Sequence, residues 1–452
     1  MVEVTTLDLV IIGLYLLFML LVGVWFVKRI KNTDDYYVAG RTLGPVVLAA
    51  TVCATIIGGS AMMGRAGIAY TTGFMAIATA LPYMLGMFIF SGYAGRIQQV
   101  GEKYHIESIP SLFEYRFGKP AKCVLAAMVA FAMVGTVAAQ VTATATIIKL
   151  LGGQVGISYE MGAFIATAIF IIYTAASGLF GVVYTDVLQF FMLIIFVYIL
   201  IPFSSIRLSG RFFLLLAEPG QILPGASYRT AASWATLSPI WCLPWPVPRC
   251  GRGPLLPRAK RQPPRACSGG TSIYMVTIAL VFFMGLAGRQ ILPDVVASYG
   301  SSDAVVPALA VSILPPGLTG LALAGILSVM MSTADSYLLV SVQTFVHDLG
   351  KNFMPEMTEK HEILMSRVMS VVLAMGALII ALYIKNAYNV LMFAWSFYAA
   401  AAGLPSLAAL YWKKATSQGI ISAMTGGFVV CVGWKLAGNP WGLGETVPGA
   451  LV

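Results

Sequence analysis

The chain has 452 residues, of which 59% are hydrophobic and only 10% are charged, whereas a soluble domain has about 25% charged residues. A water-soluble globule cannot bury so much apolar surface, so the composition excludes a soluble enzyme, a disordered protein and a coiled coil. What remains is an all-α protein that crosses a membrane several times. The net charge of +10 does not indicate a nucleic-acid partner, because most of the excess lies in one segment, 206–271.

Apolar stretches of about 20 residues cross a bilayer as helices. We find eleven in the chain, at 7–27, 43–64, 70–94, 121–151, 161–182, 186–205, 272–292, 317–346, 366–384, 388–412 and 418–436. The loops 28–42 and 95–120 are rich in Lys and Arg, which places them in the cytoplasm and the N-terminus outside. The leader from Met1 to Asp8 carries two acids and no base, so the first span is not a cleavable signal peptide. We therefore predict a multi-pass protein of the cell membrane, plasma or bacterial inner.

Residues 206–271 break this pattern. They hold ten of the 23 prolines and nine basic residues against one acid. The flanking spans require one crossing here, yet no apolar run is long enough, so we interpret the segment as a reading-frame error that replaces a span. The alternative is a basic, proline-rich loop that binds lipid or protein. The chain also ends in what resembles the approach to another helix, so eleven spans are readable of an expected thirteen.

Two acidic residues lie inside predicted spans, where charge is costly and indicates function by default. Asp186 begins the span 186–205, and the alternative is that it only caps that helix. Asp335 lies deep in the span 317–346, and the alternative is a structural tie to a neighbouring helix. Ser332, Asp335 and Ser336 share one helix face. Their oxygen atoms suit a hard monovalent cation.

The span 43–64 contains a glycine pair, Gly58 and Gly59, near its middle. Paired glycines favour local unwinding, which frees carbonyl groups to face a cavity, and broken helices of this kind build the ion and solute sites of secondary transporters. The alternative is close helix packing by small residues. No Ser-His-Asp, HExxH or Walker pattern appears. The six cysteines have no disulfide or metal-ligand spacing. We expect a transporter rather than an enzyme.

Several stretches carry a family resemblance: DDYYVAGRTLG at 34–44, ATIIGGSAMMGRAGIAYTTG at 54–73, GLFGVVYTDVLQ at 178–189, DAVVPALAVSILPPGLTGLALAGILSVMMSTADSYLL at 303–339 and YWKK at 411–414. With these motifs the chain resembles the sodium:solute symporters, which include proline, pantothenate, sialic acid and sodium/glucose transporters. By motif the resemblance covers about 2–205 and 271–452.

The resemblance implies an inverted-repeat transporter fold of five plus five helices with broken core helices. A leading helix and loop would occupy 1–42, and the first repeat 43–205. Segment 206–271 would stand where a core helix belongs. The rest of the second repeat would occupy 272–412, and a trailing helix 413–452.

The resemblance also implies the site residues. The carbonyl groups of Ala54, Ile57 and Val329 and the hydroxyls of Ser332 and Thr333 would bind sodium. Asp186 matches an acid that can help to hold an additional ion in some members. Asp335 and Ser336 are candidates for the same ion because they lie on the polar face of the span 317–346. The solute would contact residues of the broken helix and two other spans: Gly58, Gly59, Ser60, Gln140, Trp395 and Tyr398. One departure is Ile56, where some members have an acid.

We therefore predict sodium-coupled secondary active symport of a small organic solute into the cell by alternating access. Na⁺ is the coupling ion and no cofactor is expected. The partners are the solute, Na⁺ and the lipid bilayer, with no nucleic acid. Two alternatives are a membrane solute sensor or scaffold that does not transport, and an inactive frameshifted product. The solute, the ion stoichiometry and the oligomeric state stay open.

Overall fold

A computed structural model describes residues 4–27, 57–77, 108–152, 156–204, 263–350, 358–440 and 443–451. It also describes a few single positions between these ranges: Tyr36, Ala50, Thr51, Ala54, Thr55, Tyr104 and Met354. All regular structure within this part of the chain is helical. Seven of its helices are long and apolar enough to cross a membrane, which confirms an all-helical, multi-pass membrane protein.

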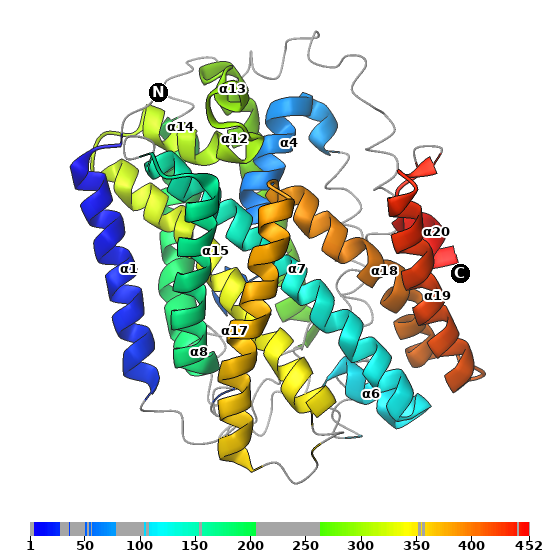
Figure 1. The fold of residues 1–452 in the computed structure, drawn as a ribbon. Coiled ribbons are helices and arrows are strands. Elements are labelled where there is room, and N and C mark those ends of the chain that lie inside the picture. The colour runs from blue at the N-terminus through cyan, green and yellow to red at the C-terminus, as the bar shows by residue number, and fades with distance from the viewer. Residues whose placement is uncertain are drawn as a thin grey trace.

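The long helices follow one another along the chain (Figure 1). They are α1 (Thr6–Val27), α7 (Lys119–Leu151), α8 (Tyr159–Met192), α12 (Pro263–Ile291), α15 (Leu318–Gln343), α17 (Glu359–Tyr383), α18 (Ala387–Tyr411) and α19 (Ser417–Leu436). Two π-helical segments extend them, η4 (Leu193–Leu200) after α8 and η8 (Thr344–Gly350) after α15. The shorter elements are η2 (Ser60–Gly64), α4 (Arg65–Thr72), η3 (Gly73–Met75), α6 (Ile109–Phe117), α13 (Val295–Tyr299), η7 (Ser302–Ala304), α14 (Val305–Ile313) and α20 (Thr446–Leu451).

Helix α7 forms the centre of the bundle and packs against α18, α15, α8 and α17 (Figure 1). Its sequence is dominated by Ala, Val and Thr, and small side chains let membrane helices approach closely. A Cβ atom on Gly135 would lie only 2.3 Å from the Cβ atom of Ala394 on α18. The membrane-length windows of α7 and α15 are each 83% buried, whereas those of α1 and α19 are 28% and 22% buried. The peripheral helices therefore present apolar side chains outward, as lipid requires.

Nine of the eleven predicted spans coincide with apolar helices of the structure. The span 43–64 is described in part, at 50, 51, 54, 55 and 57–64, whereas most of the span 70–94 and of the segment 206–271 lies outside the described residues. One predicted boundary is wrong. We expected a gap at 183–185, but the break lies at Gly178, whose φ of 52° and ψ of −166° are not helical. Such a backbone conformation is accessible to glycine at little cost, and it moves the start of the second half of α8 upstream.

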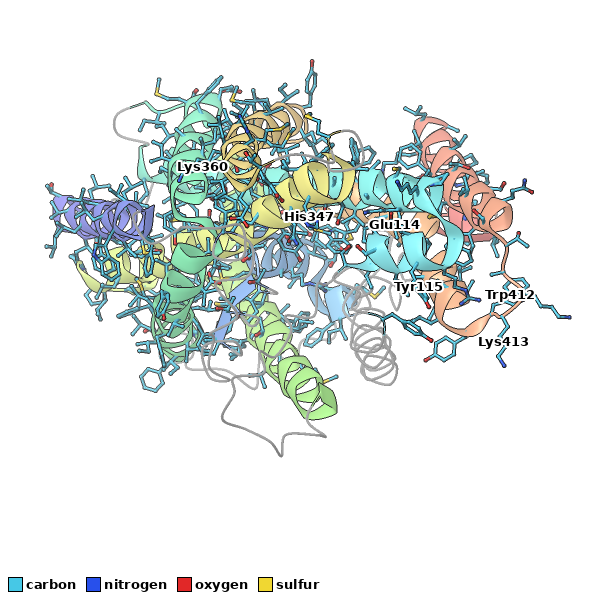
Figure 2. The ribbon with its side chains drawn as sticks, turned by 90° about the horizontal axis from the view of Figure 1, so that it is seen from below. Glu114, Tyr115, His347, Lys360, Trp412 and Lys413 are labelled. Atoms are coloured by element: carbon cyan, nitrogen blue, oxygen red, sulfur yellow. The ribbon has the colours of Figure 1, made fainter. Side chains whose placement is uncertain are left out.

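Helix α1 begins at the upper end of the bundle in Figure 1, where its first turn meets the start of α15. The lower end carries ionisable and aromatic side chains, with His347 and Glu114 near its middle and Trp412 at its rim (Figure 2). Lys, Tyr and Trp are characteristic of membrane–water interfaces. Our predicted orientation assigns this lower end to the cytoplasm.

Candidate functional site

The glycine-containing span is interrupted. Ala54 and Thr55 are helical, Ile57 and Gly58 are not, and a π-helical turn at Ser60–Gly64 leads into α4. π-helical turns inside helices are frequent at functional sites. Little room is left for a side chain at either glycine, because a Cβ atom on Gly58 would lie 2.9 Å from Cγ2 of Thr333 on α15. On Gly59 it would lie 1.9 Å from Sδ of Met330. The predicted break is therefore present, and it faces α15.

Two hydroxyls of α15 meet the carbonyl groups of the broken helix. The Ser332 Oγ lies 3.1 Å from the carbonyl oxygen of Ala54 and 3.1 Å from that of Val329. The Thr333 Oγ1 lies 3.4 Å from the Ala54 carbonyl oxygen and 3.4 Å from that of Ile57. All five residues are buried. The structure thus brings together every residue of the predicted sodium set.

The carbonyl group of Thr55 joins this cluster and was missed by motif comparison. Its oxygen lies 3.3 Å from Oγ1 of Thr333. The Thr55 hydroxyl lies 3.1 Å from Oγ of Ser336, so it links the cluster to the next turn of α15. The result is a group of neutral oxygen atoms from two helices, which is the ligand type that hard cations prefer.

Two buried carboxylates lie on the neighbouring helices α8 and α15. Asp186 is 0% exposed and Asp335 is 1% exposed. Within the described part of the chain, neither carboxylate oxygen of Asp186 has a hydrogen-bond partner. Asp335 accepts a 2.5 Å hydrogen bond from Thr174 through Oδ1, but its Oδ2 has none. The two carboxyl groups are near enough to repel each other when both are ionised. Burying a carboxylate without a partner costs free energy. A positive charge near these two side chains would therefore stabilise them.

The alternative interpretations of these acids fare differently. Asp186 lies inside α8, well past the Gly178 break, so the interpretation as a helix N-cap is wrong. Thr185 also does not cap, because its hydroxyl donates back to carbonyl groups of the preceding turn. Asp335 does connect α15 to the neighbouring helix α8, through its hydrogen bond with Thr174. This contact uses one of its two carboxylate oxygens.

Hydrogen bonds and one ring contact connect the predicted solute residues from the helix break to α18. Oε1 of Gln140 accepts a 2.7 Å hydrogen bond from the backbone N–H of Gly59. The Gln140 side chain also donates to the carbonyl group of Thr136 at 3.5 Å. The Thr136 hydroxyl in turn accepts a 2.9 Å hydrogen bond from Nε1 of Trp395. The ring of Trp395 meets that of Tyr398 edge to face, with 5.8 Å between centroids.

Thr136 was missed by the sequence analysis, although it lies four residues before Gln140 and hence on the same face of α7. Ser60 is also buried beside the break, at the start of the π-helical turn. The structure therefore places Gly58, Gly59, Ser60 and Gln140 in one region. Thr136 joins them to the aromatic pair of α18.

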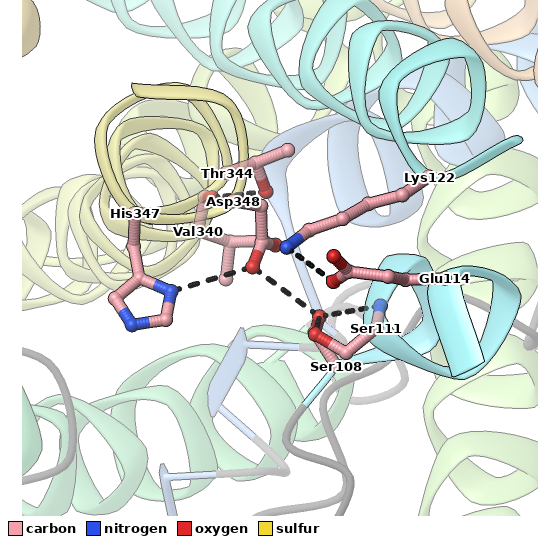
Figure 3. A network of polar contacts seen from close by, with 8 residues as sticks. All are labelled: Ser108, Ser111, Glu114, Lys122, Val340, Thr344, His347 and Asp348. Carbon is pink, nitrogen blue, oxygen red and sulfur yellow. Dashed lines mark hydrogen bonds and ion pairs between the residues drawn. The ribbon is translucent and has the colours of Figure 1, made fainter. Parts of the chain in front are cut away.

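A second polar network ties the lower end of α15 to α6 (Figure 3). Oγ of Ser108, which caps α6, donates to Oδ1 of Asp348 in η8 at 3.4 Å. The imidazole of His347 lies 3.4 Å from the same oxygen. Beside them, Lys122 and Glu114 form a 2.7 Å ion pair between α7 and α6. Ser108 and Asp348 are 240 residues apart, so no local pattern could have indicated this contact.

Comparison with known proteins identifies the family. A sequence model of the sodium:solute symporter family matches residues 36–243 and 264–427. The chain belongs to this family. The match is interrupted only at 244–263. The similarity to the family therefore extends beyond the limits at 205 and 271 that the motifs indicated. The prolines of PWPVPR at 244–249 and most of PLLPRAKRQPPR at 254–265 fall in this interruption.

The chain is similar to several bacterial transporters over most of their length. It is 26% identical to the high-affinity proline transporter of Bacillus subtilis (strain 168) over 448 residues, or 95% of this chain and 93% of that protein. It is 27% identical to the sodium/proline symporter of Escherichia coli (strain K12), covering 98% of this chain and 90% of the relative. For the sodium/pantothenate symporter of Escherichia coli (strain K12) the identity is 26%, covering 89% and 85%.

The fold agrees with a solved structure of a Na⁺-coupled sialic acid symporter in a substrate-bound, outward-open state. The TM-score is 0.74 at 18% sequence identity, covering 99% of this chain and 96% of the other. This sodium:solute symporter is therefore a sodium-coupled transporter of the membrane and not an enzyme. The sensor or scaffold alternative is not favoured.

Proposed function

We propose that the coupling sodium ion binds between the broken helix and α15. Its ligands would be the carbonyl groups of Ala54, Ile57 and Val329 and the hydroxyls of Ser332 and Thr333. One observation carries this proposal: two hydroxyls from α15 converge within 3.4 Å of carbonyl groups on a helix that is interrupted at the same point. The carbonyl group of Thr55 adds a further oxygen.

The same contacts suggest how sodium drives transport. A hydroxyl has one proton and two lone pairs, so Ser332 can donate to the Val329 carbonyl group while its lone pairs face the ion. Sodium would then join the broken helix to α15 in one conformation and leave them unjoined in another. A ligand shifts a conformational equilibrium only through such a difference in affinity. Alternating access would follow from the movement of the two halves around this joint.

We further propose that an additional cation binds near Asp186, Asp335 and Ser336. Three carboxylate oxygens there have no hydrogen-bond partner within the described residues. The Ser336 hydroxyl reaches the sodium cluster through Thr55. A positive charge at this position would offset the repulsion between the acids and make coupling depend on Asp186.

The solute is proposed to be a small organic molecule with a carboxylate group, lying beside the break. Gly58, Gly59 and Ser60 lie at the N-terminal end of the helical segment that continues into α4, and helix N-termini favour anions. Gln140 adds an amide group, and Trp395 and Tyr398 would cover the apolar part. Proline and pantothenate, the solutes named for the relatives, both carry a carboxylate.

The architecture proposed for this function is the inverted repeat. The first repeat would occupy 43–205, and the second would end near 412, after a leading helix at the N-terminus. The protein would lie in the cell membrane with its N-terminus outside and move the solute inward. Segment 206–271 would stand where a core helix belongs, and a frameshift within it is our explanation for the interruption of the family match at 244–263.

Uptake into proteoliposomes tests the proposal. The purified full chain is reconstituted with potassium inside, and radiolabelled proline, pantothenate or sialic acid is added outside with sodium or with potassium. We expect one of these carboxylates to accumulate only under an inward sodium gradient, and collapse of the gradient to abolish accumulation. Binding of a carboxylate with uptake at background would instead favour a sensor. Equal uptake in sodium and potassium would refute sodium coupling.

A further inference from the structure

The N-terminus of α15 is closed by a residue from another helix. Helices usually cap themselves with side chains at the first residue, the N-cap, and three residues later. In α15 both positions are glycine, Gly317 and Gly320, so neither can supply a side chain. Instead, the backbone N–H of Gly317 donates to Oδ1 of Asp8 at 2.8 Å. The N–H of Gly320 donates to the same oxygen at 2.7 Å.

Asp8 lies in the first turn of α1 and caps that helix as well. Its Oδ2 accepts a 3.1 Å hydrogen bond from the backbone N–H of Thr5 and a 2.6 Å hydrogen bond from the Thr5 hydroxyl. The side chain is 1% exposed. A single buried carboxylate therefore completes the N-termini of two helices, and its charge faces the positive end of both.

The backbone geometry shows that the two helices are fitted to each other at this point. A Cβ atom on Gly320 would lie 2.8 Å from Cα of Asp8. Real side chains do not tolerate such a contact with backbone atoms, so only glycine permits this approach.

Further along its length, α1 also contacts α8, the helix that carries Asp186. The Tyr15 hydroxyl accepts a 3.3 Å hydrogen bond from Gln189, which is three residues after Asp186 on α8. Figure 1 shows α1 running beside α8 along the edge of the bundle. Helix α1 is thus attached to both helices that carry candidate ion residues, although most of its surface is not buried in the protein.

We propose that Asp8 is a positioning residue for sodium binding. By fixing the upper end of α15 against α1, it sets the height at which Val329, Ser332 and Thr333 meet the broken helix. Val329 is eleven residues beyond Leu318, about 16 Å at the usual helical rise. An axial shift at the cap is therefore transmitted along a rigid helix to the ion ligands. This inference rests on the proposed sodium site. The family match begins at residue 36 and does not include α1.

Binding of ²²Na⁺ to the purified full chain, without any solute, tests this inference. We expect Asp8→Ala to raise the dissociation constant for sodium by roughly tenfold or more, the scale for residues that orient ion ligands from behind. Asp8→Asn retains one oxygen acceptor and should give a smaller rise. Gly320→Ala should weaken sodium binding like Asp8→Ala, although it leaves the carboxylate in place. The matched control is Asp294→Asn, an exposed acid in the N-cap position of α13 that makes no cap hydrogen bond, and it should not change the dissociation constant.

The outcomes separate this inference from the proposed sodium site. If Asp8→Asn and Gly320→Ala lower only the yield or the melting temperature and bind sodium as the parent does, Asp8 is merely structural and the inference is wrong. If Ser332→Ala/Thr333→Ala also binds sodium normally, the proposed site itself is wrong. If that double variant loses affinity while the Asp8 and Gly320 variants do not, only the positioning role fails.

Discussion

Replacing both hydroxyl residues of α15 is the sharpest perturbation of the proposed sodium site. In the variant Ser332→Ala/Thr333→Ala the two side-chain oxygens are lost, while the carbonyl groups of Ala54 and Ile57 remain. A hydrogen-bonding group that acts on a charge contributes about 1.5–3 kcal/mol. Two such groups at the lower value give about 3 kcal/mol. Since 1.4 kcal/mol is a factor of ten, the sodium concentration for half-maximal uptake should rise roughly 100-fold.

The assay is sodium-dependent uptake into proteoliposomes, with the reconstituted protein quantified for every variant. Ser341→Ala is the matched control, because Ser341 is buried on the same helix but its hydroxyl donates 2.8 Å back to the Tyr337 carbonyl group. Its sodium dependence should equal that of the parent. Thr333→Ser keeps the hydroxyl and should stay within a few-fold of the parent. If the double variant is reconstituted normally and its half-maximal sodium concentration is unchanged, the ion binds elsewhere and the reasoning is refuted.

Three further changes test other parts of the site. Gln140→Leu leaves the buried N–H of Gly59 without its hydrogen-bond partner, which costs about 1–3 kcal/mol. Solute affinity should therefore fall by about tenfold while sodium affinity is retained. Equal losses of both affinities would argue against a solute contact. Asp186→Asn should lower the ratio of sodium to solute transported more than it lowers the melting temperature, and an unchanged ratio in a dual-isotope uptake assay would show that Asp186 does not couple. Gly59→Ala places a Cβ atom 1.9 Å from Sδ of Met330 and should cost about 1–3 kcal/mol, measured as a lower melting temperature; a neutral effect would contradict the close approach of α15. Finally, resequencing codons 200–275 and translating all three frames should reveal an apolar run of about 20 residues in another frame, and its absence would mean that the proline-rich segment is genuine.

The sequence alone determined the class of protein and the two halves of the ion cluster. Apolar runs report membrane helices because the bilayer requires about 20 apolar residues per span. The glycine pair at 58–59 indicated a break because unwinding depends on local backbone freedom. The shared face of Ser332, Asp335 and Ser336 followed from helical periodicity alone. Each of these properties is local in the chain.

Only the tertiary structure decided how distant segments meet. The Thr55 carbonyl group, the Thr136 link to Trp395 and the Asp8 cap on α15 join residues from about 260 to more than 300 positions apart, and no local pattern encodes such pairs. The sequence did not locate the break of α8 at Gly178, because the apolar run continues through that residue without a change in composition. Helix packing chooses these contacts, since the bilayer makes every span apolar but does not determine which faces of the helices come together.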